Sequence, residues 1–409
     1  MAARSAPPSG PLSVAFVSPG WPPEAIANGI ASYTGTIVQG LRDLGARCHV
    51  LTSRPMALID DPSVRIVEPD TSSFYFRVRR KLDPESWPQK AFCQALAESV
   101  RGLHREGGLD LLEMEESYGW AALLASKCPA PIVVRLHGPW FLNGAANGAI
   151  EDAEFRKRDR AEGAGLAAAA AVSAPSASVL DEARKHFGLP LENSALIPNP
   201  VTVVPASDRW NLAGCDPKRI AFIGRFDRHK GGDLALDAIG RIVKQVPDAL
   251  LDFVGPDRGC VDDSRHTFSF SQYLEQNLPP AARENVTYHG FLPGSKAAKL
   301  RKQTLVTIVP SRYETFGIAA AEAMMAGSPV VAAGAGALLE LVQDGRNGLV
   351  AKPGDADDLA EKVLWLLNNP ARAAELGRQA AIDAEQRYAP VVVARQTLEF
   401  YQGVLARGL

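Results

Sequence analysis

Residues 305–333, LVTIVPSRYETFGIAAAEAMMAGSPVVAA, carry the pattern that decides the fold. A short apolar run is followed by a polar loop, by a helix-forming segment from Thr315 to Ala326, and by a second apolar run. Gly327 stands where a glycine commonly ends a helix, and a proline follows soon after. Strand, helix and strand in this order predict one βαβ unit of a parallel sheet.

The same alternation extends outward in both directions along the chain. Apolar runs without a polar face are typical of parallel strands that helices cover on both sides. Strands are predicted at 13–18, 47–52, 64–67, 110–114, 132–136, 168–172, 219–224, 249–254, 285–289, 305–309, 329–333 and 348–351. Helical periodicity is present at 30–44, 175–187, 233–246 and 356–368.

The length predicts two domains, because 409 residues exceed the roughly 250–300 that one core supports. The alternation pauses at 198–218, which is rich in Pro, Asn and Asp and is interpreted as the link. We expect a first domain over 1–203 and a second over 204–388. A final helix, 389–409, is expected to pack back on the first domain.

The composition excludes several classes of protein. With 46% hydrophobic and 22% charged residues and a net charge of −2, the chain reads as a soluble globular protein with no reason to bind nucleic acid. Its five cysteines are scattered, which suits a reducing cytoplasm. No apolar stretch approaches the ~20 residues of a membrane span, and no secretory signal is expected.

Two loops that follow predicted strands of the second half favour an anionic ligand. In the loop 224–232, Arg225 and Lys230 precede a helix start, and this combination suits a diphosphate, although it also occurs in solvated basic loops. In the other loop, Glu314 would face sugar hydroxyls. The backbone amides that would point to the same place are those of Thr315, Phe316, Gly317 and Ile318.

Glu322 is predicted to lie about two turns into the helix after this loop, among small and apolar neighbours. A buried carboxylate needs a partner. Both a ribose diol and an arginine elsewhere in the chain satisfy that need, and the sequence does not choose between them.

The first half offers weaker candidates. Gly29 at a helix start would admit a phosphate, but Asn28 would equally cap that helix. His137 follows the strand 132–136 and is either structural or placed over a reacting centre, with Trp140 close behind it. Three glutamates after the strand 110–114 face the site or form a solvated loop: Glu113, Glu115 and Glu116.

A basic cluster, Arg77, Arg79, Arg80 and Lys81, follows the aromatic residues 74–76. A solvated turn is the interpretation we favour. Contact with an anionic acceptor or a lipid surface is the alternative.

The order and spacing of these motifs resemble the retaining glycosyltransferases of family 4. That family has the GT-B fold, an α/β architecture of two Rossmann-like domains whose parallel sheets face a central cleft. The first half matches only at its glycine loop and His137, so the resemblance does not specify the acceptor. The matching elements are Asn28-Gly29-Ile30, His137-Gly138, Ile197–Val201, Gly224-Arg225 with Lys230-Gly231, Glu314 with Glu322, and the segment from Gly336 to Val350.

The resemblance implies a hexosyltransferase that uses a nucleoside-diphosphate sugar of the UDP, GDP or ADP type. It implies that Arg225 and Lys230 bind and steady the leaving diphosphate, that Glu314 contacts the transferred sugar, and that Glu322 binds the ribose. Amides from Phe316 to Ile318 would hold sugar and phosphate, with Gly29 and His137 opposite them.

Further roles at the site are expected from position. Tyr288 and Phe291 would border the base, and Glu115, Glu116 and Trp140 would lie on the acceptor side. No metal and no tightly bound cofactor are expected. The acceptor would be a carbohydrate, a lipid-linked or another hydroxyl compound, and the enzyme cytoplasmic with at most peripheral membrane contact.

Two other functions stay open from the sequence. A nucleotide-sugar epimerase has the same two-domain design, and an inactive sugar-nucleotide binding protein would retain the same loops. A dehydrogenase is disfavoured because no complete G-x-G-x-x-G follows a strand.

Overall fold

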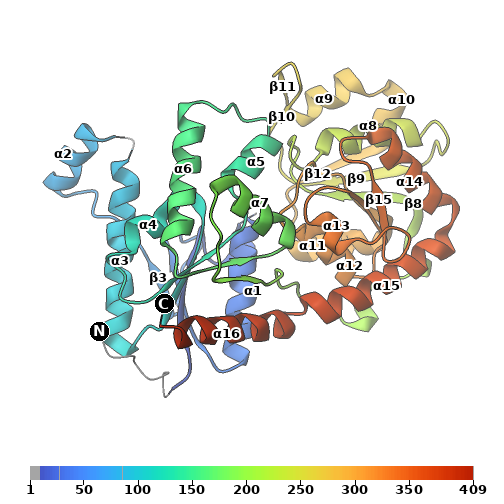
Figure 1. Ribbon diagram of the computed structural model, residues 1–409. Coiled ribbons are helices and arrows are strands. Elements are labelled where there is room, and N and C mark those ends of the chain that lie inside the picture. Colours follow the sequence, from blue (N-terminus) through green and yellow to red (C-terminus); the bar gives the residue numbers. More distant parts are fainter. Residues whose placement is uncertain (1–9, 27, 85, 409) are drawn as a thin grey trace. The chain divides into compact units, whose positions relative to one another are not determined.

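The computed structural model describes residues 10–26, 28–84 and 86–408, which form two compact α/β units (Figure 1). The first unit comprises the chain up to Phe141, Glu151–Pro200, and the chain from Pro390 onward. The second comprises Leu142–Ile150 and Val201–Ala389. The predicted GT-B class, two α/β domains with parallel sheets, is confirmed.

The first unit is built on a seven-stranded parallel sheet of order β3-β2-β1-β4-β5-β6-β7. Its strands are β1 Ser13–Ser18, β2 Arg47–Thr52, β3 Val64–Ile66, β4 Leu111–Glu115, β5 Ile132–Arg135, β6 Ala171–Ala174 and β7 Ser194–Leu196. Its helices are α1 Gly29–Asp43, α2 Phe74–Leu82, α3 Trp87–Gly107, α4 Trp120–Leu124, α6 Ala153–Ala168, α7 Ala177–Phe187 and α16 Pro390–Ala406, and α5 Trp140–Ala146 continues into the second unit.

The second unit has a six-stranded parallel sheet of order β12-β9-β8-β13-β14-β15. Its strands are β8 Asp216–Ile223, β9 Leu250–Val254, β12 Val286–Gly290, β13 Thr304–Val309, β14 Val330–Ala333 and β15 Leu349–Ala351. Its helices are α8 Gly232–Ile242, α9 Phe270–Asn277, α10 Pro280–Arg283, α11 Gly294–Gln303, α12 Ile318–Met325, α13 Leu338–Leu341, α14 Ala356–Asn368 and α15 Pro370–Tyr388.

The C-terminal helix α16 belongs to the core of the first unit. Val393, Ala394 and Tyr401 are buried there with Ile37 of α1. Gly40 of α1 lies so close to α16 that a Cβ at this position would stand 2.9 Å from the Cβ of Ala394. A side chain larger than hydrogen at this position would therefore separate the two helices.

Three local expectations are wrong. The predicted strand 168–172 starts too early, because α6 continues to Ala168 and β6 begins at Ala171. The short strand β7 was not predicted, nor was the antiparallel pair β10 (Cys260–Val261) and β11 (Thr267–Phe268). The basic cluster after residue 73 is not a turn but the helix α2, which the Ser73 Oγ caps by accepting from the Phe76 amide.

Candidate functional site

The two loops that the sequence singled out in the second unit meet at one edge of its sheet. They follow β8 and β13, which are neighbouring parallel strands. Gly231 has a φ of 70°, and a Cβ on it would lie 2.2 Å from the carbonyl oxygen of Pro310. Only glycine fits there, and its close contact brings the Arg225–Lys230 loop onto the loop that carries Glu314.

Lys230 and Glu314 form an ion pair at this contact, in which the glutamate is buried. The Lys230 Nζ donates to the Glu314 Oε1 at 2.7 Å, and the Ser311 hydroxyl donates to the same oxygen at 2.8 Å. Glu314 is 7% exposed. Burial opposes its charge, but the charge of Lys230 and the hydrogen bonds from Lys230 and Ser311 outweigh burial and lower the pKa of Glu314 below its ordinary value. Glu314 is therefore ionised and acts as an acceptor only.

Arg225 is the more exposed cation of the pair proposed for the diphosphate. Its Nε donates to the Asp227 Oδ2 at 2.6 Å, and its side chain is 40% exposed. Asp227 also accepts from the Lys230 amide at 2.7 Å, so this carboxylate organises the loop. Sequence reasoning missed Asp227, although an acid two residues after Arg225 was a visible signal.

His229 and Arg312 join the same two loops and were also missed. The Nε2 of His229 lies 2.8 Å from the carbonyl oxygen of Tyr313, and the Arg312 amide donates to the His229 carbonyl at 2.8 Å. Arg312 holds Asp233 of α8 with both guanidinium nitrogens, at 2.8 and 2.6 Å. Burial and the charge of Lys230 lower the pKa of His229 to about 4, so this imidazole is neutral near pH 7.

The helix after the Glu314 loop begins later than predicted. It starts at Ile318 and not at Thr315, because Gly317 adopts a left-handed conformation with a φ of 94°. Thr315 and Phe316 therefore lie in the loop, and the Phe316 ring packs edge-on against Tyr388. Among the described residues, the amides of Phe316, Gly317 and Ile318 have no hydrogen-bond acceptor. These amides are available to a ligand oxygen.

Glu322 is not the buried carboxylate that the sequence suggested. It lies one turn into α12, with a side chain that is 46% exposed. Its Oε2 accepts from the Arg301 Nη2 of α11 at 3.1 Å. The arginine partner that the sequence left open is thus present, and the remaining carboxylate oxygen faces the surface of the unit.

The strands β8, β9 and β12 end side by side next to the Arg225 loop. Gly255 after β9 has a φ of 144°, and a Cβ on it would lie 1.9 Å from the Gly224 carbonyl oxygen. Tyr288 of β12 stacks on Phe270 with ring centroids 4.1 Å apart and is 40% exposed. Phe291 is 50% exposed. Both predicted base-side aromatics therefore present ring surface near this sheet edge.

In the first unit, His137 lies half-buried just after β5, and its surroundings keep it neutral. Its ring meets that of Tyr33 edge-on, with centroids 4.9 Å apart. Burial and the charge of Arg135 hold the pKa of His137 well below its ordinary value. Arg135 in turn donates to the Ile197 carbonyl at 2.8 Å and to the Asn199 Oδ1 at 2.7 Å.

Glu113 and Glu115 lie in β4 and Glu116 directly follows it, and all three are buried, so they do not form a solvated loop. Glu113 accepts from the Tyr33 hydroxyl at 2.8 Å and from the Tyr401 hydroxyl. Glu116 accepts from the amides of His137 and Gly138 at 2.9 and 2.7 Å. Its carboxylate therefore fixes the turn at His137. Contact between Glu116 and the acceptor substrate stays a prediction.

Burial, with the charges of Glu162 and Glu115, raises the pKa of Glu116 to about 8, and the two amide donors oppose that shift. Glu115 accepts from the Ser117 hydroxyl at 2.8 Å, and burial raises its pKa as well. Repulsion from the neighbouring carboxylates and burial therefore both favour the protonated form of Glu116.

The remaining first-unit candidates have local partners. Trp140 donates its amide to the Glu162 Oε2 at 2.6 Å and lies under the Arg158 guanidinium, 4.2 Å from the ring centroid. Gly29 begins α1, and Asn28 caps that helix by accepting from the amides of Ile30 and Ala31. The capping alternative for Asn28 is thus realised, and Gly29 is left as a small residue at the helix start.

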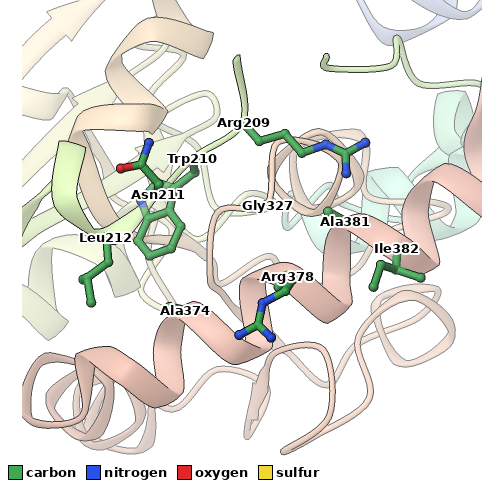
Figure 2. Close-up of a pocket in the computed structure, with 9 residues that line it drawn as sticks. All are labelled: Arg209, Trp210, Asn211, Leu212, Gly327, Ala374, Arg378, Ala381 and Ile382. Carbon is green, nitrogen blue, oxygen red and sulfur yellow. The ribbon is translucent and has the colours of Figure 1, made fainter. Parts of the chain in front are cut away.

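A cavity of about 310 Å³ lies elsewhere in the second unit and includes none of the residues proposed for the donor (Figure 2). Arg209 and Arg378 stand at its border, and Trp210 lines its wall. Arg209 is already paired with Glu385 at 2.6 Å.

In the described part of the chain, no group of His, Cys, Asp and Glu side chains is arranged to hold a metal ion. Nor is any described helix both long and apolar enough to cross a bilayer.

Two family models match the chain in succession. The model described as Glycosyltransferase Family 4 matches residues 27–203, and the model described as Glycosyl transferases group 1 matches residues 207–383. Together they include every residue that was proposed for the donor and the acceptor from the sequence.

Curated relatives carry names of the same kind. A D-inositol 3-phosphate glycosyltransferase of Paenarthrobacter aurescens is 26% identical over 92% of this chain and 93% of its own length. An uncharacterised glycosyltransferase of Methanocaldococcus jannaschii is 31% identical, but the match covers 46% of this chain and 45% of that protein. For several relatives the chain thus matches only about half of their length.

Solved structures share the fold. The sucrose-phosphate synthase of Thermosynechococcus elongatus superposes with a TM-score of 0.72 at 20% identity, over 97% of this chain and 100% of that one. HepE of Anabaena, solved in complex with UDP and glucose, superposes with a TM-score of 0.67 at 20% identity, over 96% and 100%. Both are described as proteins that handle sugars or nucleotides.

Proposed function

Because the chain belongs to the group 1 glycosyltransferases and is thus a transferase of GT-B fold, we propose a specific reaction for it. It moves a hexose-type sugar from a nucleoside-diphosphate donor to an acceptor hydroxyl, with retention of configuration. The observation that supports this most is the convergence of Arg225, Lys230 and Glu314 at one edge of the second sheet, beside the amides of Phe316 and Gly317.

Arg225 and Lys230 serve the leaving diphosphate. As the anomeric bond breaks, negative charge grows on the departing phosphate, and fixed cations contribute most where charge develops. Lys230 is preorganised for this task because Glu314 and the packing of Gly231 hold its loop in place. Arg225 is exposed enough to turn from Asp227 to a phosphate oxygen, and the buried Asp227 then keeps the Lys230 amide as a donor.

Glu314 orients the transferred sugar. An ionised carboxylate accepts from sugar hydroxyls and donates nothing, which suits a ligand rich in O–H donors. The amides of Phe316 to Ile318 donate to oxygens of the sugar or phosphate, and Glu322 binds the ribose with the carboxylate oxygen that Arg301 does not hold. Tyr288 and Phe291 flank the base. Gly29 and His137, which is neutral, also contact the substrate in this proposal.

The acceptor attacks from the face that the diphosphate leaves. The acceptor hydroxyl forms the new glycosidic bond, the bond between sugar and phosphate breaks, and the departing phosphate oxygen takes the acceptor's proton. No protein carboxylate becomes a covalent nucleophile in this scheme, and none is required to act as the base. Neither a metal nor a bound cofactor takes part in the proposed reaction.

The donor is of the UDP, GDP or ADP type, and UDP is the first to test because HepE was solved with UDP and glucose. The acceptor is a carbohydrate, lipid-linked or other hydroxyl compound. One relative, 32% identical over 56% of this chain, is named phosphatidyl-myo-inositol mannosyltransferase, which is compatible with a lipid-linked acceptor. We place the enzyme in the cytoplasm, with at most peripheral contact with a membrane.

A thermal-shift series against UDP, GDP and ADP, and then against their sugars, tests the proposal. A nucleotide at 100 times its dissociation constant stabilises the fold by about 2.7 kcal/mol. No stabilisation by any of them would overturn the donor site. NMR of the donor incubated alone separates the remaining alternative, since an epimerase converts the donor whereas a transferase at most hydrolyses it slowly.

A further inference from the structure

Helix α2, FYFRVRRKL, lies at the periphery of the first unit (Figure 1), and its apolar side chains other than Phe76 are exposed. Phe74 is 76% exposed and Leu82 is 75% exposed. Tyr75 and Val78 are exposed as well. At about 100° per residue, these four side chains form one outward stripe along the helix.

The opposite side of α2 holds it on the protein in this orientation. Phe76 is buried and packs on Trp87 and Ala91 of α3. Arg79 donates to the Tyr75 hydroxyl at 3.1 Å, and its guanidinium lies 5.8 Å from the Trp87 ring centroid. Phe74, Val78 and Leu82 thus point away from the cluster that Phe76 joins, while Tyr75, at the edge of the stripe, meets the Trp87 ring with centroids 5.4 Å apart.

Cations border the stripe. Lys81 flanks it on one side and Arg79 on the other, with Arg77 and Arg80 behind. All four are exposed, and among the described residues Arg77, Arg80 and Lys81 have no acidic partner. An apolar stripe between basic side chains is the pattern of a helix that lies in the interface of a membrane.

We propose that α2 binds the surface of a bilayer that contains anionic lipids. Its stripe enters the boundary between headgroups and acyl chains, while the cations contact lipid phosphates. A second copy of this chain fits the same surface poorly, because two cationic borders would face each other. The inference deepens the membrane contact in the proposed function, but it rests on α2 alone and stands whether or not the donor assignment holds.

Co-sedimentation of the full chain with vesicles tests this proposal. We expect binding to vesicles of equal parts phosphatidylcholine and phosphatidylglycerol that falls with added salt, and little binding to phosphatidylcholine alone. Phe74→Ser with Leu82→Ser should lower the partition coefficient by roughly tenfold or more. Arg77→Gln with Lys81→Gln should do the same.

Matched controls use positions outside α2. Leu58→Ser removes an equally exposed leucine of the first unit, which is 99% exposed, and Lys296→Gln with Lys299→Gln removes two exposed cations of α11. Both should bind vesicles like the parent chain. The nucleotide-induced thermal shift, recorded on every variant, should not change with α2 substitutions, so a failed donor assignment and a failed membrane assignment give different results.

Three results would overturn the proposal. The first is equal binding to both kinds of vesicle, and the second is parental binding by the α2 variants. The third is a concentration-dependent dimer in light scattering that Phe74→Ser with Leu82→Ser dissociates, since that would assign the stripe to self-association.

Discussion

The Nζ of Lys230 and the Oε1 of Glu314 lie 2.7 Å apart, and this ion pair joins two loops whose residues are 84 positions apart in the chain. The two partners differ in burial, because the lysine side chain is 25% exposed and the glutamate side chain 9%. Replacing the lysine and replacing the glutamate should therefore lower the stability by different amounts.

Lys230→Met should destabilise the protein more than Glu314→Gln. The first change leaves a buried carboxylate with only the Ser311 hydroxyl, at a cost of about 3 kcal/mol. The second leaves a lysine that reaches water, at about 1 kcal/mol. Urea unfolding of both variants measures the difference. Equal losses, or a larger loss in Glu314→Gln, would show that the pair is not the buried contact described here.

Glu322→Gln should destabilise the protein by about 1–3 kcal/mol, because the Arg301 side chain, which is 4% exposed, loses its charged partner. If Glu322 also binds the donor ribose, KM for the donor should rise roughly tenfold while kcat changes little. Steady-state kinetics with varied donor checks this. Glu361→Gln, at an exposed position of α14, is the control. An unchanged donor KM would leave Glu322 as no more than the partner of Arg301.

His229 should make the protein less stable toward acid. Its pKa in the folded chain is about 4, below the ordinary 6.5, so the unfolded chain binds more protons between these values. The free energy of unfolding should therefore fall as the pH drops from about 6.5 toward 4, and this contribution should be complete above that range.

His229→Gln keeps a donor for the Tyr313 carbonyl and should reduce the fall in the free energy of unfolding over this pH range, as measured by denaturant titration. His266→Gln, at an exposed position, should show the same fall as the parent. An unchanged pH dependence in His229→Gln would contradict the assignment of this fall to His229.

Tyr401→Phe, in the C-terminal helix α16, should lower the stability of the first unit. The substitution removes one of two hydroxyls that donate to Glu113, which is 3% exposed, and leaving a buried polar group with one hydrogen bond fewer costs about 1–3 kcal/mol. Tyr118→Phe, at a ring that is 40% exposed, should cost under about 0.5 kcal/mol. Chemical unfolding of both variants decides, and equal small losses would argue against a hydrogen-bonded Glu113 carboxylate.

The order of strands and helices was predictable because strands that are buried on both faces consist of consecutive apolar residues. The observed bounds of β1, β2 and α14 are the predicted ones. By contrast, β7 has only three residues, too few to show a period. Helix α2 was not predicted because an apolar helix face is expected to be covered by other elements, whereas the apolar stripe of α2 is exposed.

The candidate site was predictable as a pair of loops but not as a set of contacts. Which side chains meet depends on Gly231 lying against Pro310, a close approach that local sequence does not report. The burial expected for Glu322 failed for a related reason. Small apolar neighbours along a helix do not say which of its sides is covered, and the partner Arg301 comes from α11.

The charge assignment at the leaving group is tested most directly by kcat of Arg225→Ala with Lys230→Ala at saturating donor. Arg228→Ala, in the same loop but paired with Asp263, is the control for loop integrity. Loss of both cations should lower kcat on the order of a thousandfold, whereas the control should stay near the parent. A double variant whose kcat remains within about tenfold of the parent, or ~1.4 kcal/mol, would contradict the account.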